Sequence, residues 1–155
     1  MMQFRRALVG ALVALTATIG VVAFAAPASA AAPSICGAAG YTNGRNTIVH
    51  NDLNGSGAYV YADVCWKPTG DGYYSTAVFW TVSDTEADGS GATIRMEWTG
   101  TDGRTHYDVP PSSQRAWHYL DAVEGDWGKG GIKNLYVRAC LTNADSEAHH
   151  CGAKG

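Results

Sequence analysis

Turn-forming dipeptides occur at short intervals along this chain, so the extended segments between them must be short. Five Asn-Gly or Asp-Gly pairs occur between residues 43 and 103, and such pairs accept the positive φ angles of tight turns. The intervening segments are rich in Val, Thr, Tyr and Trp, which favour strands, and none shows a helical period. The sequence therefore predicts an all-β fold, a small antiparallel β-sandwich of about seven short strands. The expected strands are Asn46–His50, Ala58–Trp66, Tyr73–Ser83, Thr93–Trp98, Arg104–Val109, Arg115–Leu120 and Ile132–Leu141.

Three connecting segments have distinct signals. Thr99–Gly103 is expected to close a hairpin between two strands. Pro110 and Pro111 must end the strand that precedes them, because proline cannot donate to a strand ladder. The segment 121–131 contains four glycines and is expected to form a long irregular loop.

The first thirty residues have the pattern of a cleaved export signal. Arg5 and Arg6 form a basic start, an apolar run covers residues 7–26, and Ala28-Ser29-Ala30 supplies a small-residue cleavage site. A membrane anchor is the alternative, but Gly, Thr and Pro residues dilute the run. We therefore expect residues 1–30 to be a signal peptide and residues 31–155 to be a single secreted, extracellular domain.

The charge balance limits the classes of partner. The expected signal holds two of the eleven basic residues and none of the fourteen acidic ones, so residues 31–155 carry a net charge of 9 − 14 = −5. An acidic, lysine-poor surface argues against nucleic acid or an anionic membrane as the partner. Other secreted proteins, or a glycan, are the expected partners.

The four cysteines predict two disulfide bonds, since their number is even and the domain is expected outside the cell. No Cys-x-x-Cys pair points to zinc. Strand alternation puts Cys65 and Cys140 on the side of their strands opposite the apolar rows, so neither is expected to cross the core. The favoured pairs are Cys36–Cys65 and Cys140–Cys151, although a bulge in either strand would reverse this parity.

The same alternation predicts the core. Apolar rows run along three expected strands, and Trp66, Trp80 and Trp98 are expected to be buried with them. The rows are Ala58, Val60, Ala62 and Val64, then Ile94 and Met96, then Leu135, Val137, Ala139 and Leu141.

No catalytic signature is found. The serines between glycines do not form a nucleophile elbow, and His106 and His118 are isolated within their segments. Asp84, Glu86 and Asp88 resemble the opening of a calcium loop, but Arg95 stands where that loop needs glutamate. We interpret these carboxylates as a solvated acidic turn. The sequence predicts a protein that is not an enzyme and has no metal and no cofactor.

Aromatic residues outside the expected core are the candidates for partner binding, because they offer large, rigid contact areas. Two lie on the outward parity of the second expected strand, two flank His118, and one lies in the glycine-rich segment. They are Tyr59, Tyr61, Trp117, Tyr119 and Trp127.

The segment Leu135–Leu141, followed by a polar loop and Cys151-Gly152, resembles the ending of many small secreted actinobacterial proteins. Within that group, the size, the two expected disulfides and the expected sandwich resemble the adaptor subunits of umbrella toxin particles. In those antibacterial complexes the adaptor joins a lectin subunit to the spokes of a large toxin protein. The resemblance implies a non-catalytic linker with these two kinds of partner. It assigns no binding residue.

Two other functions fit the sequence. A secreted protease inhibitor would present Asp108–Ser113, whose two prolines reduce the entropy lost on docking. A carbohydrate-binding module would use Tyr59, Tyr61 or Trp117 as a stacking platform. A small hydrolase ranks last because no catalytic pair is visible.

Overall fold

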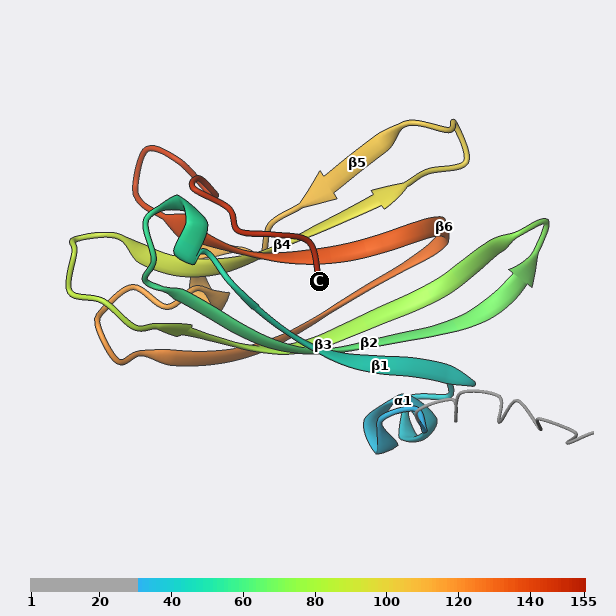
Figure 1. Ribbon diagram of the computed structural model, residues 1–155. Coiled ribbons are helices and arrows are strands. Elements are labelled where there is room, and N and C mark those ends of the chain that lie inside the picture. Colours follow the sequence, from blue (N-terminus) through green and yellow to red (C-terminus); the bar gives the residue numbers. More distant parts are fainter. Residues whose placement is uncertain (1–30) are drawn as a thin grey trace, which may run out of the picture.

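Six strands, hydrogen-bonded in the order β1-β2-β3-β6-β4-β5, form a sheet that folds over on itself into two layers (Figure 1). This computed structural model describes residues 31–155, and the expected signal peptide lies outside the described residues. The elements are α1 (Ser34–Ala38), β1 (Asn43–His50), η1 (Asp52–Asn54), β2 (Ala58–Gly70), β3 (Tyr73–Asp84), β4 (Gly91–Thr99), β5 (Thr105–Asp108), η2 (Ser112–Gln114) and β6 (Ala122–Thr142). The predicted all-β sandwich is confirmed, with six strands rather than about seven.

Strand β6 belongs to both layers. Residues from Ala122 to Lys129 pair with β3 in the first layer, and residues from Lys133 to Thr142 pair with β4 in the second. β3 and β4 run in opposite directions, and β6 pairs antiparallel with both, so the chain reverses direction between these two halves (Figure 1). The reversal contains Gly131, with a φ angle of 67°. Asn134, with a φ angle of 54°, lies just after it, where the register with β4 shifts. In Figure 1 the orange strand runs out along one layer and doubles back along the other.

The prediction of an irregular loop at residues 121–131 is wrong, because most of this segment is the first half of β6. Gly125 and Gly128 are paired with β3 in the sheet, whereas Gly130 and Gly131 lie at the reversal. Gly125 lies opposite Trp80, and a Cβ atom there would lie 2.5 Å from the indole ring. Trp127, expected in the loop, therefore lies on a strand.

The strand predicted at Arg115–Leu120 is also wrong. Apart from one bridge at Ala116, these residues form turns. The carboxylate of Asp121 accepts the backbone N–H groups of Trp117 and His118 at 3.2 and 2.9 Å. This local capping replaces strand pairing, and Leu120 has a positive φ of 71°.

The hairpin predicted at Thr99–Gly103 is present, and another turn-forming pair, Asp71-Gly72, closes a second hairpin. Asp71 and Gly72 connect β2 to β3 with φ angles of 54° and 75°, as a two-residue primed turn requires. Residues 100–104 connect β4 to β5, and the Gly100 N–H donates to the Arg104 carbonyl at 2.9 Å.

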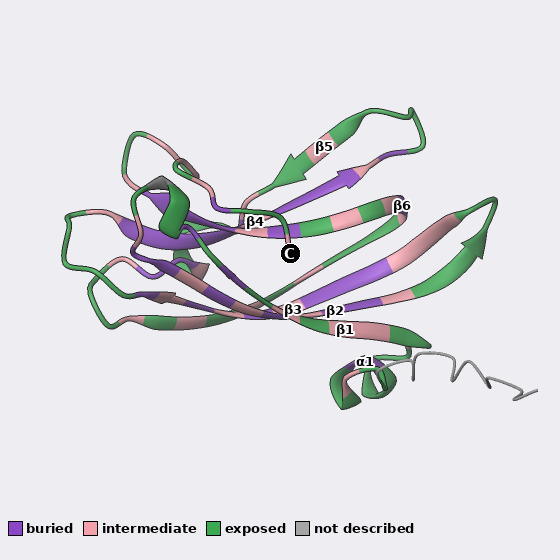
Figure 2. Ribbon diagram, viewed as in Figure 1, coloured by how far each residue is buried: buried purple, intermediate pink, exposed green. Residues whose placement is uncertain are grey.

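The hydrophobic core lies between the two layers, and the predicted rows supply it. In Figure 2 the buried residues are concentrated along β2, β3, β4 and the second half of β6. Trp80 and Trp98 are buried, whereas Trp66 is partly buried at the edge of the core. Strand alternation therefore predicted most of the inner surface.

The two disulfides are Cys36–Cys65 and Cys140–Cys151, as predicted. Both disulfides lie outside the hydrophobic core, which fills the space between the two layers. The first packs under α1 with Ala77, in a small cluster of its own on the outside of the first layer. Two disulfides are consistent with an extracellular protein.

The second disulfide ties down a C-terminal tail that closes one seam of the sandwich. Gly152 and Gly155 donate their N–H groups to the carbonyls of Ala139 and Val137, at 2.9 and 3.0 Å. On its other side the tail lies against β1, where the Arg45 guanidinium donates to the Gly155 carbonyl at 3.0 Å. A side chain at Gly152 would overlap the backbone of β1.

Removing each disulfide should destabilise the domain to a different degree. The bonded cysteines are 29 residues apart in Cys36–Cys65 and 11 apart in Cys140–Cys151. Loop-closure entropy then predicts losses of about 3.6 and about 2.8 kcal/mol for the respective Cys→Ala pairs. Urea unfolding of the two double variants measures the losses. A larger loss for the Cys140–Cys151 pair would contradict this account.

Gly125→Ala should destabilise the domain by about 1–3 kcal/mol, because the new methyl group overlaps the Trp80 ring and the core must shift. Gly128→Ala is the matched control on the same strand, since the nearest atom to its Cβ lies 3.5 Å away. Thermal or urea unfolding compares the two. Equal stability of the two variants would show that Trp80 does not need the glycine.

Candidate functional site

The five aromatic residues predicted to bind partners lie in three separate regions. Tyr59 and Tyr61 lie on the outside of the first layer and are partly buried. Trp117 and Tyr119 lie in the segment between η2 and β6. Trp127 faces inward and contacts Trp98 of the other layer, with ring centroids 5.2 Å apart. The structure does not bring the five residues into one site.

The outside of the first layer carries a carboxylate-rich surface, which we call the acidic face: Tyr61, Asp63, Phe79, Thr81, Glu124 and Asp126. Strand register places Asp63, Phe79 and Asp126 in one row across β2, β3 and β6. These residues line a hollow of about 410 Å³ beside α1. None of the three carboxylates is in an ion pair within residues 31–155.

The tyrosine of the acidic face is held in position by neighbours. The Tyr61 hydroxyl donates to Asp63 Oδ1 at 3.2 Å, and the Asn46 amide donates to both side chains. Next to it, the rings of Tyr59 and His50 meet edge to face at 4.9 Å. The result is an ordered aromatic and acidic surface.

The outside of the second layer carries the opposite charge. We call it the basic face: Arg95, Tyr107, Tyr136, Arg138 and Lys154, arranged around Glu97. Glu97 is buried and forms ion pairs with three cations, to Arg138 Nε at 3.0 Å, to Lys154 Nζ at 3.3 Å and to Arg95. Arg95 and Lys154 also lie over the rings of Tyr107 and Tyr136, both at 4.9 Å. One carboxylate thus organises three cations and two exposed aromatic rings.

Burial alone would raise the pKa of Glu97, but the hydrogen bonds and charges of Arg95, Arg138 and Lys154 outweigh it and lower the pKa below its usual value. The alternation of apolar and polar residues along this strand predicts that Glu97 and Arg95 point outward. The partners Arg138 and Lys154 are contributed by β6 and by the tail, and no local pattern connects them to Glu97.

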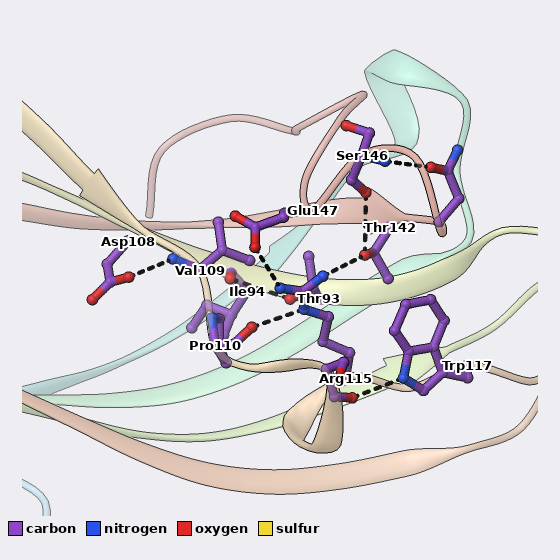
Figure 3. Close-up of polar contacts among 12 residues, drawn as sticks. Thr93, Ile94, Asp108, Val109, Pro110, Arg115, Trp117, Thr142, Ser146 and Glu147 are labelled. Atoms are coloured by element: carbon purple, nitrogen blue, oxygen red, sulfur yellow. Dashed lines mark hydrogen bonds and ion pairs between the residues drawn. The ribbon is translucent and has the colours of Figure 1, made fainter.

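A third feature is a groove between the η2 segment and the loop after β6, which we call the Trp117 groove (Figure 3). It has a volume of about 390 Å³, and its lining includes Arg115, Trp117, Asn143, Asp145 and Glu147. Arg115 is buried: its guanidinium donates to the Pro110 carbonyl at 2.8 Å and to Thr142 Oγ1 at 3.3 Å, and lies 3.4 Å from Glu147 Oε1. No sequence pattern pointed to Arg115 as a residue of a candidate site.

The loop required by the inhibitor alternative is held against the protein. Pro110 is buried, and its carbonyl accepts a hydrogen bond from the Arg115 guanidinium. Asp108 accepts the indole N–H of Trp127 at 2.9 Å, across the seam between β5 and β6. The geometry therefore gives no particular support to a protruding inhibitory loop at Asp108–Ser113.

The seam between β5 and β6 also holds a His–Asp pair. His106 Nε2 lies 3.0 and 3.1 Å from the two carboxylate oxygens of Asp102, and this bond lowers the pKa of Asp102. The imidazole stacks on Trp98 with centroids 5.9 Å apart. In residues 31–155 no hydroxyl or thiol is hydrogen-bonded to this imidazole, so the pair lacks an adjacent nucleophile.

The predicted acidic turn has its carboxylates bound mainly to nearby backbone and side-chain groups. Asp84 Oδ1 accepts the Glu86 N–H at 3.1 Å, Asp88 Oδ1 accepts the Ser90 N–H at 2.8 Å, and Glu86 accepts the Ser56 hydroxyl at 2.6 Å. Burial and the nearby carboxylates raise the pKa of Asp84. Across the described part of the chain, no cluster of three or more His, Cys, Asp or Glu side chains is suited to holding a metal ion.

In comparisons with known proteins, no family model, curated protein or solved structure matches the chain. Within residues 31–155, no helix has the length and apolar character needed to cross a membrane.

Glu97→Gln should lower the free energy of unfolding by about 3 kcal/mol near neutral pH, because it leaves three cations around an uncharged side chain. The folded-state pKa of Glu97 is lowered, so its contribution is present above the usual pKa of 4.5 and is lost as the pH falls through the folded value. The stability difference between wild type and variant should therefore shrink in acid.

Urea unfolding at about pH 7 and about pH 3 measures this difference. Glu124→Gln is the control, because Glu124 is exposed and should change stability by less than about 0.5 kcal/mol. A Glu97→Gln effect that stays constant between the two pH values would contradict the account.

Proposed function

We propose that this protein is a secreted, non-catalytic binding protein that joins two protein partners, an adaptor in an extracellular complex. The observation that carries the proposal is the pair of outer faces, acidic on one layer and basic on the other. They point away from each other on opposite sides of the sandwich, so two partners can bind at the same time without competing.

The acidic face suits a partner with exposed Lys or Arg side chains. Its three carboxylates have no ion-pair partner in the described chain, and the Tyr61 and Phe79 rings lie among them. An aromatic ring next to a carboxylate attracts a cationic side chain through both charge and the ring quadrupole. Such complementarity raises association rates and selects partners.

The basic face suits an acidic partner. Glu97 neutralises one of the three cations around it, and Tyr107 is 65% exposed. Tyrosine and arginine are enriched at the centres of protein interfaces, where they supply area and directed hydrogen bonds. Because Glu97 already holds the cations in position, less side-chain entropy is lost on binding.

The resemblance to umbrella toxin adaptors supplies the partner classes. On this proposal one face binds a lectin subunit and the other binds a large toxin chain, as part of an antibacterial complex outside the cell. The expected export signal and the two disulfides are consistent with that location.

Two face variants test the proposal. Asp63→Asn with Asp126→Asn alters the acidic face, and Tyr107→Ser with Tyr136→Ser alters the basic face. All four positions are partly or fully exposed, so folding should be preserved. Affinity-tagged proteins are purified from culture supernatant of the producing strain, and co-purifying chains are identified by mass spectrometry.

The wild type should co-purify with two kinds of larger secreted chain, and each variant should lose one kind and keep the other. The acidic-face partner should also dissociate as salt is raised, because screened charges hold it. Recovery of the wild type as a free monomer at every growth stage, or loss of the same chain by both variants, would contradict the proposal.

A further inference from the structure

We propose that the Trp117 groove is a binding site for an uncharged sugar, with one pyranose ring stacked on Trp117. The groove shares no residue with the acidic or basic face, so this site adds to the proposed adaptor function and does not depend on it. Its volume of about 390 Å³ lies within the range of small-molecule sites.

Trp117 supplies the apolar wall. Its indole N–H donates to the Ser112 carbonyl at 2.8 Å, which fixes the orientation of the ring. The side chain is only partly buried although it lines the groove. In Figure 3 the indole rises beside the Arg115 side chain, on the side where the Ser146 loop lies. A partly exposed, oriented indole is a suitable platform for the C–H face of a sugar ring.

The opposite wall is polar and rigid. Asn143 Oδ1 accepts the backbone N–H groups of Asp145 and Ser146, at 3.0 and 2.7 Å, and so closes the loop into a tight turn. The side chains of Asp145 and Glu147 are exposed above this turn. Carboxylates accept hydrogen bonds from sugar hydroxyls, which are the main polar groups of a pyranose.

Arg115 forms the floor of the groove and holds its two sides together. It connects the η2 segment, through the Pro110 carbonyl, to the end of β6, through Thr142. Its bond to Glu147 then positions one carboxylate of the opposite wall. The groove therefore has a mixed polar lining on a fixed frame, as sites that recognise orientation require.

The charge of the lining selects against acidic sugars. Two carboxylates, Asp145 and Glu147, stand against one guanidinium, so an anionic ligand would be repelled. Stacking on Trp117 does not depend on the charge of the ring, so an uncharged sugar gains this contact without the repulsion.

Isothermal titration calorimetry and saturation-transfer NMR test the site on the purified protein. The probes are chitotriose, cellotriose and mannotriose, with trigalacturonate as the anionic control. At least one uncharged probe should bind saturably with a Kd of about 1 mM or tighter. It should bind more tightly than trigalacturonate.

Variants assign the binding to the groove. Trp117→Ala should weaken it at least about tenfold, whereas Trp117→Phe, which keeps a ring but loses the bond to Ser112, should stay within about threefold. Asp145→Ala leaves the backbone turn intact and should also weaken binding. Tyr119→Ala is the control, since Tyr119 is exposed nearby but does not line the groove.

The proposal is overturned by any of three results. The first is no saturable binding of the uncharged probes at about 10 mM. The second is equal binding by the Trp117→Ala and Tyr119→Ala variants. The third is binding of trigalacturonate that is as tight as that of the uncharged probes. None of these results would bear on the two outer faces.

Discussion

The reversal of β6 is the constraint on which the rest of this structure depends. A single strand supplies the last strand of one layer and the first strand of the other, so the two layers are joined by continuous backbone. Gly130 and Gly131 lie at the point where the chain must turn sharply, and Gly131 adopts a positive φ that favours glycine. The apolar rows of both halves then face each other across the core.

This arrangement leaves the sandwich with two different seams. The tail closes one seam, held by Cys140–Cys151 and by the bond from Arg45 to Gly155. The other seam is bridged by side chains, chiefly the contact of Trp98 with Trp127 and the bond from Trp127 to Asp108. The groups proposed to bind partners lie on the two outer faces and in the Trp117 groove.

The outer faces differ in how their charges are arranged. On the basic face, Glu97 is buried and holds three cations, so its charges are ordered before any partner arrives. On the acidic face the carboxylates face solvent without a cation, and the Tyr61 ring is oriented by Asp63 and Asn46. A preorganised surface loses little entropy on binding, which suits a small protein that must hold two larger ones.

Strand alternation predicted the core rows and, through the parity of Cys65 and Cys140, both disulfides. That inference succeeded because the side a residue faces is a local property of a strand. The first half of β6 was missed because glycines in a sequence indicate a loop, whereas here Gly125 makes room for Trp80, more than forty residues earlier in the chain.

The candidate sites were only partly accessible from sequence for the same reason. The outward positions of Tyr59 and Tyr61 could be predicted, but the cations around Glu97 and the walls of the Trp117 groove come from distant segments. Their proximity depends on β6 and the tail, and no spacing in the sequence encodes it.

The central claim is that both outer faces are occupied at once in an extracellular complex. Covalent side-chain footprinting of the intact complex, compared with the isolated chain, measures this directly. The account predicts that Tyr61 on the acidic face and Tyr107 and Tyr136 on the basic face are protected together, while Tyr119 reacts equally in both samples. Protection confined to one face, or to neither, would contradict it.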